Sequence, residues 1–157
     1  MVKAGKINTY VVRELQMIVR DAPLIPIEVE PFVGLDFSGP EMIYNLFKGL
    51  NSFPAEAFIV LHLDSKNRLS AMSTISIGTM NSALVHSREI FRAAIANLTA
   101  GIICIHAHLS GDPEPSRQDL ELTQKLKKAG DIIGIRIIDH IIVGRGKYVS
   151  FHERSLI

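Results

Sequence analysis

The sequence predicts a single α/β domain in which a mixed β-sheet is flanked by helices. Short apolar runs that suit strands alternate with segments whose apolar residues recur at helical spacing. Ile132–Val143 is almost continuously apolar and β-branched, which is typical of a central strand, and Lys147–Phe151 follows a glycine-rich turn as a last strand. The 157 residues, 47% hydrophobic and 21% charged, are enough to build one buried core.

Residues 1–37 are predicted to be an N-terminal extension that belongs to the same unit as the domain over residues 38–157. Within the extension, Tyr10–Arg20 alternates loosely and could form an edge strand, and a connection rich in proline and glycine follows it. Residues 1–7 contain two lysines but lead into no long apolar stretch. We therefore expect no signal peptide.

The first helix is expected at the start of the domain. Ser38 or Gly39 could cap it, with Pro40 in its first turn. Its apolar face would consist of Met42, Ile43, Leu46, Phe47 and Leu50.

A β-hairpin is predicted next. Ala57–Leu63 is a short apolar strand, Asp64–Asn67 has the composition of a turn, and Arg68–Ile77 returns as the second strand. Gly78 interrupts this pattern, after which Asn81–His86 could form a further strand.

Two more helices surround a buried strand over Ile102–Ile105. Ser87 stands where the N-cap of the earlier helix would be, and Gly101 separates that helix from the strand. Ser116 starts the later helix after a loop rich in glycine and proline, and Gly130 is expected just past its end. The apolar faces would be Phe91, Ala94, Ile95 and Leu98 in the earlier helix and Leu122, Leu126 and Ala129 in the later one.

A candidate metal site lies between His106 and Asp119. Residues i and i+2 of a strand share a face, so His106 and His108 can point at one ion. Two imidazoles and the Asp119 carboxylate leave the fourth tetrahedral position of zinc open for water, as in catalytic sites. A lone His-x-His is weak support, and Ser116 with Asp119 also forms a plain capping box. The combined spacing His-x-His-x7-Ser-x2-Asp nevertheless predicts a zinc site.

The remaining histidines and the single cysteine are weaker candidates. Cys104 lies in an apolar strand and is interpreted as a small core residue. We interpret His140 as a core histidine whose side chain does not pair with the preceding carboxylate, and His62, His86 and His152 as structural or surface residues. One cysteine permits no intrachain disulfide, which fits a cytoplasmic location. No apolar run reaches the roughly 20 residues that span a bilayer.

The motif resembles that of the JAMM metalloenzymes, also called JAB or MPN, and more narrowly their bacterial RadC-type branch. The resemblance covers roughly Ser38–Ser150. It implies the cytidine-deaminase-like JAB/MPN fold, a zinc ion bound by His106, His108 and Asp119, and hydrolysis of peptide or isopeptide bonds. The residues that carry it are His106–Pro113, Pro115, Ser116 and Asp119, with Gly78–Thr79, Arg88–Phe91 and Asp139–Ile142.

The chain departs from the family pattern in two respects. Ala107 and Leu109 stand where the family usually has Asn and Pro. Neither is a metal ligand, so the departure concerns the rigidity of the loop and its contacts with substrate. Longer members also carry a helix-hairpin-helix region that binds DNA, and we expect none in the first forty residues here.

The resemblance also implies a catalytic glutamate just before the first core strand, and Glu56 stands there. Zinc lowers the pKa of its water to about 7, and a carboxylate can take the proton and return it to the leaving amine. Glu41 suits the first turn of a helix, and Glu89 and Glu121 are expected on helix surfaces. Ser116 could donate to the oxyanion or cap its helix, and the sequence leaves both roles open.

A zinc-dependent hydrolase acting on a peptide or protein is therefore the first functional hypothesis. The RadC-type resemblance offers a second, a nuclease or accessory factor in DNA repair, although a net charge of +1 gives little electrostatic basis for binding nucleic acid. A non-catalytic MPN-type binding module is the third. We expect no membrane association, and the oligomeric state stays open, with a homodimer as one alternative.

Overall fold

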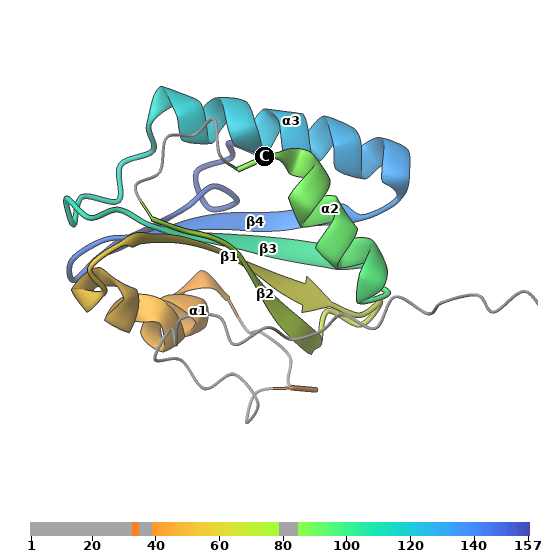
Figure 1. Ribbon diagram of the computed structural model, residues 1–157, viewed down its shortest axis with the longest axis horizontal. Coiled ribbons are helices and arrows are strands. Elements are labelled where there is room, and N and C mark those ends of the chain that lie inside the picture. Colours follow the sequence, from red (N-terminus) through yellow and green to blue (C-terminus); the bar gives the residue numbers. More distant parts are fainter. Residues whose placement is uncertain (1–32, 35–38, 79–84) are drawn as a thin grey trace, which may run out of the picture.

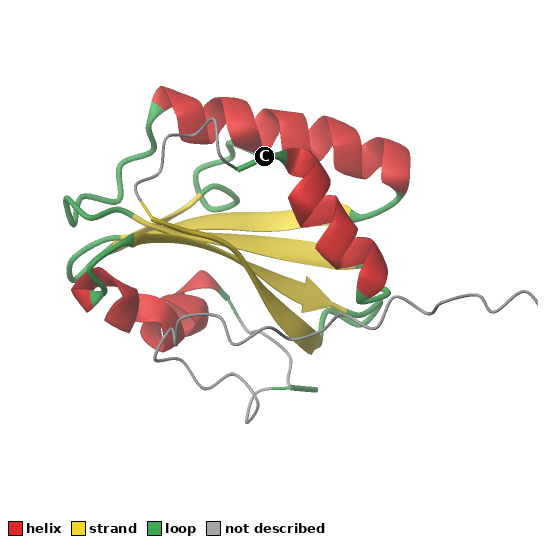
Figure 2. Cartoon of the chain, viewed as in Figure 1, coloured by secondary structure: helices red, strands yellow, loops and turns green. Residues whose placement is uncertain are grey.

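The computed structural model describes residues 33–34, 39–78 and 85–157. These residues form one five-stranded mixed sheet, with α1 on one face and α2 and α3 on the other (Figures 1 and 2). The predicted single α/β domain is confirmed. In chain order the elements are α1 (Pro40–Phe47), the 3-10 helix η2 (Lys48–Ser52), β1 (Glu56–Leu63), β2 (Leu69–Gly78), α2 (Ser87–Ala96), β3 (Gly101–Ala107), α3 (Arg117–Ile133), β4 (Arg136–Val143) and β5 (Tyr148–Ser150).

The strand order β2-β1-β3-β4-β5 brings distant parts of the chain to one edge of the sheet. β3 and β4 are parallel and joined by α3, whereas the other neighbours are antiparallel. Because β1 and β3 run in opposite directions, Phe58 near the start of β1 lies opposite His106 near the end of β3. The beginning of β1 therefore lies beside the end of β3, where the chain leaves the sheet for α3.

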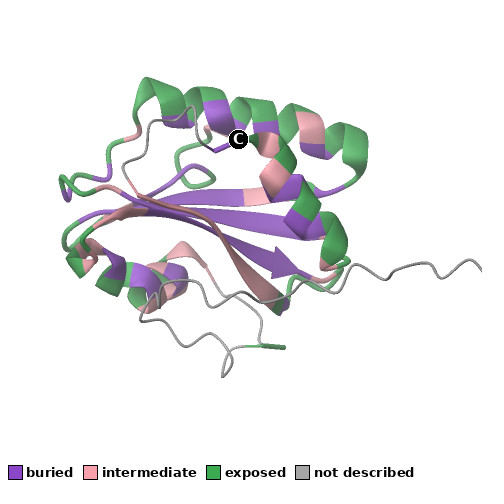
Figure 3. Ribbon diagram, viewed as in Figure 1, coloured by how far each residue is buried: buried purple, intermediate pink, exposed green. Residues whose placement is uncertain are grey.

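Strands β1 and β3 are buried almost throughout, because helices cover both faces of the sheet (Figure 3). Side chains alternate along β1, so Ile59 and Leu61 pack toward α1 while Phe58 and Val60 pack toward α2 and α3. The α1 side of the core includes Ile43, Phe47, Leu50, Ile103, Ile105 and Ile141, and the opposite side includes Ile90, Phe91, Ala94, Ile102, Cys104 and Leu126.

The early elements agree with the sequence-based expectations. Gly39 is the N-cap of α1, with Pro40 as the first helical residue. The Asp64 carboxylate accepts hydrogen bonds from the backbone N–H groups of Lys66 and Arg68, which fixes the hairpin turn. The expected edge strand at Tyr10–Arg20 lies outside the described residues. No helix among the described residues is long and apolar enough to cross a membrane.

The region around α2 differs from the prediction at both ends. His86, and not Ser87, is the N-cap, and the described end of the expected strand Asn81–His86 is not in a strand. The helix ends at Ala96, and Ile95 in its last turn and Leu98 after its end are both exposed instead of buried. Leu98 adopts a φ of 51° in the turn that follows, which takes it off the helical face.

The boundary between α3 and β4 was also predicted wrongly. α3 continues to Ile133 and is capped by Gly134 at a φ of 84°, so Gly130 lies inside the helix. Ile132 and Ile133 belong to the helix although they are apolar and β-branched, and both are exposed. Gly130 is needed where it is because a Cβ atom there would lie 2.4 Å from the Ile135 carbonyl oxygen.

We expect Gly130→Ala to lower the free energy of unfolding by about 1–3 kcal/mol, because the backbone of the following turn must move to admit the methyl group. The gain of roughly 1 kcal/mol in helix propensity offsets part of this cost. Urea denaturation measures the effect. Gly49→Ala is the matched control, since a Cβ atom there has no neighbour within 4 Å. Equal stability of the two variants would contradict the packing role of Gly130.

Candidate metal centre

Two histidines lie at the edge of the sheet where β3 ends. His106 is a residue of β3 and only 4% exposed, and His108 follows directly after the strand. Their rings meet edge to face, with centroids 4.6 Å apart and an interplanar angle of 83°. The same-face geometry expected for residues i and i+2 therefore places both imidazoles together.

Asp119 faces these histidines from the first turn of α3. Its Oδ1 lies 3.0 Å from His106 Nδ1, and its Oδ2 lies 3.4 Å from His108 Nε2. One ligand atom from each residue lies within 4.8 Å of the others, so the three side chains could hold a single metal ion.

The chemistry of these donors fits zinc. The Nδ1–H of His108 donates to the Asp112 carbonyl oxygen at 2.8 Å, which leaves the Nε2 lone pair for a ligand. The Nε2 atom of His106 is buried and has no hydrogen-bond partner. Two imidazoles and one carboxylate would leave the fourth tetrahedral position of a zinc ion open. A buried ring nitrogen without a partner is the kind of exception that a bound ion would explain.

The loop between His108 and α3 is held from several sides. Gly111 adopts a φ of 78°, which suits glycine. The turn after β4 packs closely on this loop, since a Cβ atom at Gly144 would lie 2.4 Å from Pro113 Cδ. Outer ion pairs join Lys147 to Asp112 at 3.1 Å and Arg154 to Glu114 at 2.8 Å. The loop that follows the candidate ligand His108 is thus tied to the C-terminal part of the domain.

Glu56 reaches the same place from the first position of β1. Its Oε2 lies 4.0 Å from His106 Nε2, and its Oε1 accepts a long hydrogen bond of 3.5 Å from the Leu109 backbone N–H. The side chain is 22% exposed, so it lies at the rim of the site. A hollow of about 230 Å³ joins these groups and is lined by Glu56, His106, His108, Ser110, Ser116, Gln118 and Asp119.

Ser116 makes the capping box in this structure. Its backbone N–H donates to Asp119 Oδ2 at 2.8 Å, and its hydroxyl accepts from the Asp119 N–H at 3.2 Å. The hydroxyl proton goes to Asp119 Oδ2 at 2.5 Å. While Asp119 accepts this proton, the hydroxyl has none to give to an oxyanion.

The electrostatics of the centre are set by Asp119. Burial raises the pKa of its carboxyl, but hydrogen bonds with His106, His108 and Ser116 outweigh burial and hold the pKa far below the ordinary value. The hydrogen bond that His108 donates to the Asp119 carboxylate raises the pKa of His108, and burial opposes this only in part. The pair therefore favours a carboxylate facing a protonated imidazole.

Comparison with known proteins assigns the chain to a family. The model of the RadC-like JAB domain matches residues 37–156. The chain belongs to the RadC-like JAB domain family. The UPF0758 protein GSU0386 of Geobacter sulfurreducens is 43% identical over 122 residues, which cover 77% of this chain and 53% of that protein.

Two other UPF0758 proteins match the RadC-like JAB domain over a similar length. The UPF0758 protein TTE0897 of Caldanaerobacter subterraneus is 44% identical over 125 residues, 78% of this chain and 54% of the relative. A UPF0758 protein of Methanosarcina mazei is 41% identical over 121 residues, 76% and 53% of the two chains. The chain spans about half the length of the curated relatives it matches.

Histidines elsewhere in the RadC-like JAB domain lie apart from the metal centre or behind it. His86 and His152 are exposed. His62 is fully buried and bonded at both ring nitrogens, to Ser73 at 2.8 Å and to Thr99 at 3.0 Å. Burial lowers the pKa of His62 to about 4. These three histidines contribute no ligand, in agreement with the sequence-based interpretation.

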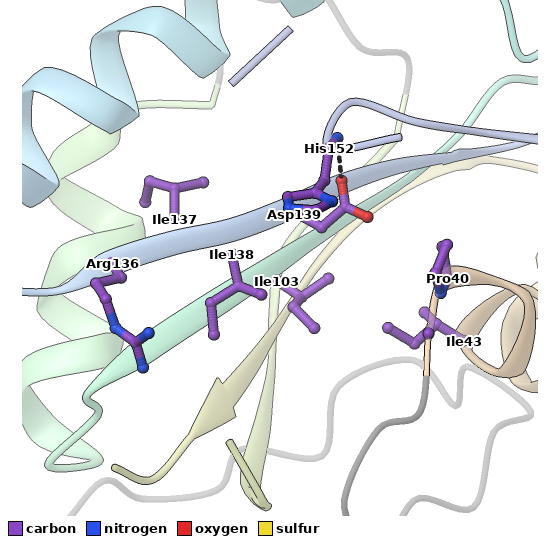
Figure 4. Close-up of a pocket in the computed structure, with 9 residues that line it drawn as sticks. Pro40, Ile43, Ile103, Arg136, Ile137, Ile138, Asp139 and His152 are labelled. Atoms are coloured by element: carbon purple, nitrogen blue, oxygen red, sulfur yellow. Dashed lines mark hydrogen bonds between the residues drawn. The ribbon is translucent and has the colours of Figure 1, made fainter. Parts of the chain in front are cut away.

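His140 and Cys104 are core residues, as predicted. Cys104 is fully buried, and burial raises the pKa of its thiol to about 12. His140 packs on the α3 side of β4, while Asp139 lines a hollow of about 370 Å³ on the α1 side (Figure 4). The Asp139 carboxylate accepts hydrogen bonds from the Ser150 hydroxyl at 2.6 Å and from the His152 backbone N–H at 2.9 Å.

Some groups at the site carry no individual signal in their residue type. Ser110 and Gln118 line the hollow, but neither residue type marks a metal centre. The carbonyl oxygen of Asp112 holds His108 through the backbone, which every residue type can do.

We predict that the metal-free protein loses stability as the pH rises above about 6.5, the pKa of His108 in the unfolded chain, because this pKa is raised in the folded protein. Its raised folded pKa contributes stability that is complete below the unfolded value and lost as the pH passes the folded value. The lowered pKa of Asp119 acts in the other direction, contributing stability above about pH 3.9 that is lost on acidification.

Urea denaturation in the presence of a chelator measures this dependence. His108→Asn should flatten the alkaline loss, and His86→Asn, a change at an exposed histidine, should leave it intact. A wild-type unfolding free energy that stays constant as the pH rises above about 6.5 would contradict the assignment.

Proposed function

We propose that this RadC-like JAB domain is a zinc-dependent hydrolase of the JAMM type that cleaves peptide or isopeptide bonds in a protein substrate. The observation that carries the proposal is the position of Glu56. A carboxylate from the start of β1 lies 4.0 Å from the partnerless nitrogen of His106, in the hollow that also contains His108 and Asp119. A closed structural site would have no use for this rim carboxylate.

The proposed division of labour follows from these positions. His106, His108 and Asp119 would hold zinc, which when bound supplies Lewis acidity and lowers the pKa of a water. Glu56 takes a proton from the attacking water as its oxygen bonds to the scissile carbonyl carbon. It then gives that proton to the amine as the carbon–nitrogen bond breaks. Its place at the rim, 22% exposed, lets it contact both water and leaving group.

A protein substrate suits the surroundings of the hollow. The hollow is open to solvent, and polar side chains of Ser110 and Gln118 line it beside the ligands. The neighbouring Leu109 is 46% exposed and its backbone N–H faces Glu56. An extended chain could lie across this rim with its peptide group over the metal ligands.

The first test is metal content. Purified protein should hold about one equivalent of zinc, because the open three-ligand set matches zinc chemistry. Atomic emission after gentle purification, followed by dialysis against excess zinc, measures it. A content of less than about half an equivalent of zinc, with no rebinding on dialysis, would contradict the proposal. His106→Ala should abolish binding, whereas His86→Ala should not.

Glu56→Gln should keep zinc but slow hydrolysis by about 10²–10⁴-fold, because the amide can neither take nor return the proton. New amino groups released from a peptide and isopeptide library measure the activity. Glu41→Gln, in the first turn of α1, is the matched control and should behave as wild type. Hydrolysis by Glu56→Gln at the wild-type rate would exclude Glu56 as the base.

Ser116→Ala separates the two roles of the serine. Loss of the cap alone should cost about 0.5–2 kcal/mol of stability, with little change in the rate per zinc-loaded molecule. An oxyanion role would instead lower kcat by about 10²–10³-fold. Because the Ser116 hydroxyl donates its proton to Asp119 in the structure, we expect the loss of stability without the loss of kcat. Urea denaturation and kinetics on the zinc-loaded variant provide the two readouts.

A further inference from the structure

A buried histidine lies behind the metal centre without a ligand role. His140 of β4 is fully buried, and its Nε2 atom has no hydrogen-bond partner. Phe151 stacks on its ring with centroids 4.6 Å apart, and Phe58 lies 5.6 Å from it. Phe58 is also 5.9 Å from the ring of His106. A polar ring with one unsatisfied nitrogen is a costly choice for such a core position.

The other ring nitrogen of His140 makes a hydrogen bond that accounts for a histidine at this position. His140 Nδ1 lies 2.7 Å from the hydroxyl of Thr123, one turn after Asp119 on α3. The Thr123 hydroxyl also donates to the backbone carbonyl oxygen of Asp119 at 2.7 Å. A hydroxyl has a single proton, so Thr123 must accept from His140. The ring of His140 therefore carries its proton on Nδ1 and leaves Nε2 bare.

These bonds form a chain from β4 to the metal-bearing turn. His140 donates to Thr123, and Thr123 donates to the carbonyl of Asp119, whose side chain faces the two histidine ligands. A hydroxyl that accepts and donates at once has both bonds strengthened by polarisation. This series of hydrogen bonds fixes the first turn of α3 relative to the sheet, because the ring of His140 is packed between Phe58 and Phe151.

We propose that Thr123 and His140 are positioning residues that set the place of Asp119 and so the affinity of the centre for zinc, a role that rests on the proposed zinc function. Neither touches the metal or the substrate. Partners behind a metal ligand commonly change metal affinity by about 10–100-fold when removed, because the ligand loses its orientation. The zinc affinity of the site would then depend in part on two core residues, Thr123 and His140.

The experiment compares zinc affinity by competition with a chromogenic chelator. Thr123→Val keeps the shape of the side chain and removes the hydroxyl, so zinc should bind about 10-fold more weakly or worse. Thr123→Ser restores the hydroxyl and should bind within about threefold of wild type. His140→Asn offers an amide N–H to Thr123 and should retain more affinity than His140→Leu.

Thr99→Val is the matched control for a purely structural effect. Thr99 is also a buried threonine bonded to a buried histidine, His62, but it lies ahead of β3, at the end of that strand away from His106. Both valine variants should lower the unfolding free energy of the metal-free protein. Only Thr123→Val should weaken zinc binding.

The outcomes separate the two proposals. If wild-type protein binds no zinc, the hydrolase proposal falls and the positioning role falls with it. If wild type binds zinc and Thr123→Val binds it equally well, the positioning role alone is overturned. An NMR measurement of the ring nitrogens of His140 gives a further readout in metal-free protein, where a proton on Nε2 would contradict the chain of bonds.

Discussion

The Asp119 carboxylate, buried between two imidazoles, is the constraint around which the rest of the domain is arranged. A carboxylate that is only 4% exposed is costly unless each oxygen has a partner. His106, His108 and the cap residue Ser116 supply those partners. Each comes from a different local structure: a strand, the loop after it, and the start of a helix. The parallel pair of β3 and β4, with α3 between them, is what allows these to meet.

Much of this arrangement could be predicted because it depends on local pattern. Strand alternation placed His106 and His108 on one face, and the spacing to Ser116 and Asp119 matched one helical turn. The errors fell where tertiary contacts override local preference. Gly130 resembled a helix end, but its missing side chain serves the close passage of Ile135. Ile132 and Ile133 have the composition of a strand, yet they complete the last turn of α3.

The parts of the site that the sequence did not reveal act through backbone atoms or from the core. The backbone carbonyl of Asp112 accepts a hydrogen bond from His108 Nδ1, and such a contact cannot be predicted from residue type because every residue has a carbonyl. Thr123 and His140 look like ordinary core residues in the sequence, and only their shared hydrogen bond links them to Asp119. Glu56 comes from a different strand, β1, so its assignment needed a family pattern and not spacing.

The origin of the site residues in the chain has a consequence for the effect of single substitutions. His106, His108 and Asp119 come from one continuous strand–loop–helix segment, whereas Glu56 is contributed by a neighbouring strand through a single side chain at its first position. Under the proposed mechanism, the residues that would bind an ion and the residue that would move a proton thus lie on separate segments. A single substitution at Glu56 would then remove the proton transfer and leave the three candidate ligands in place.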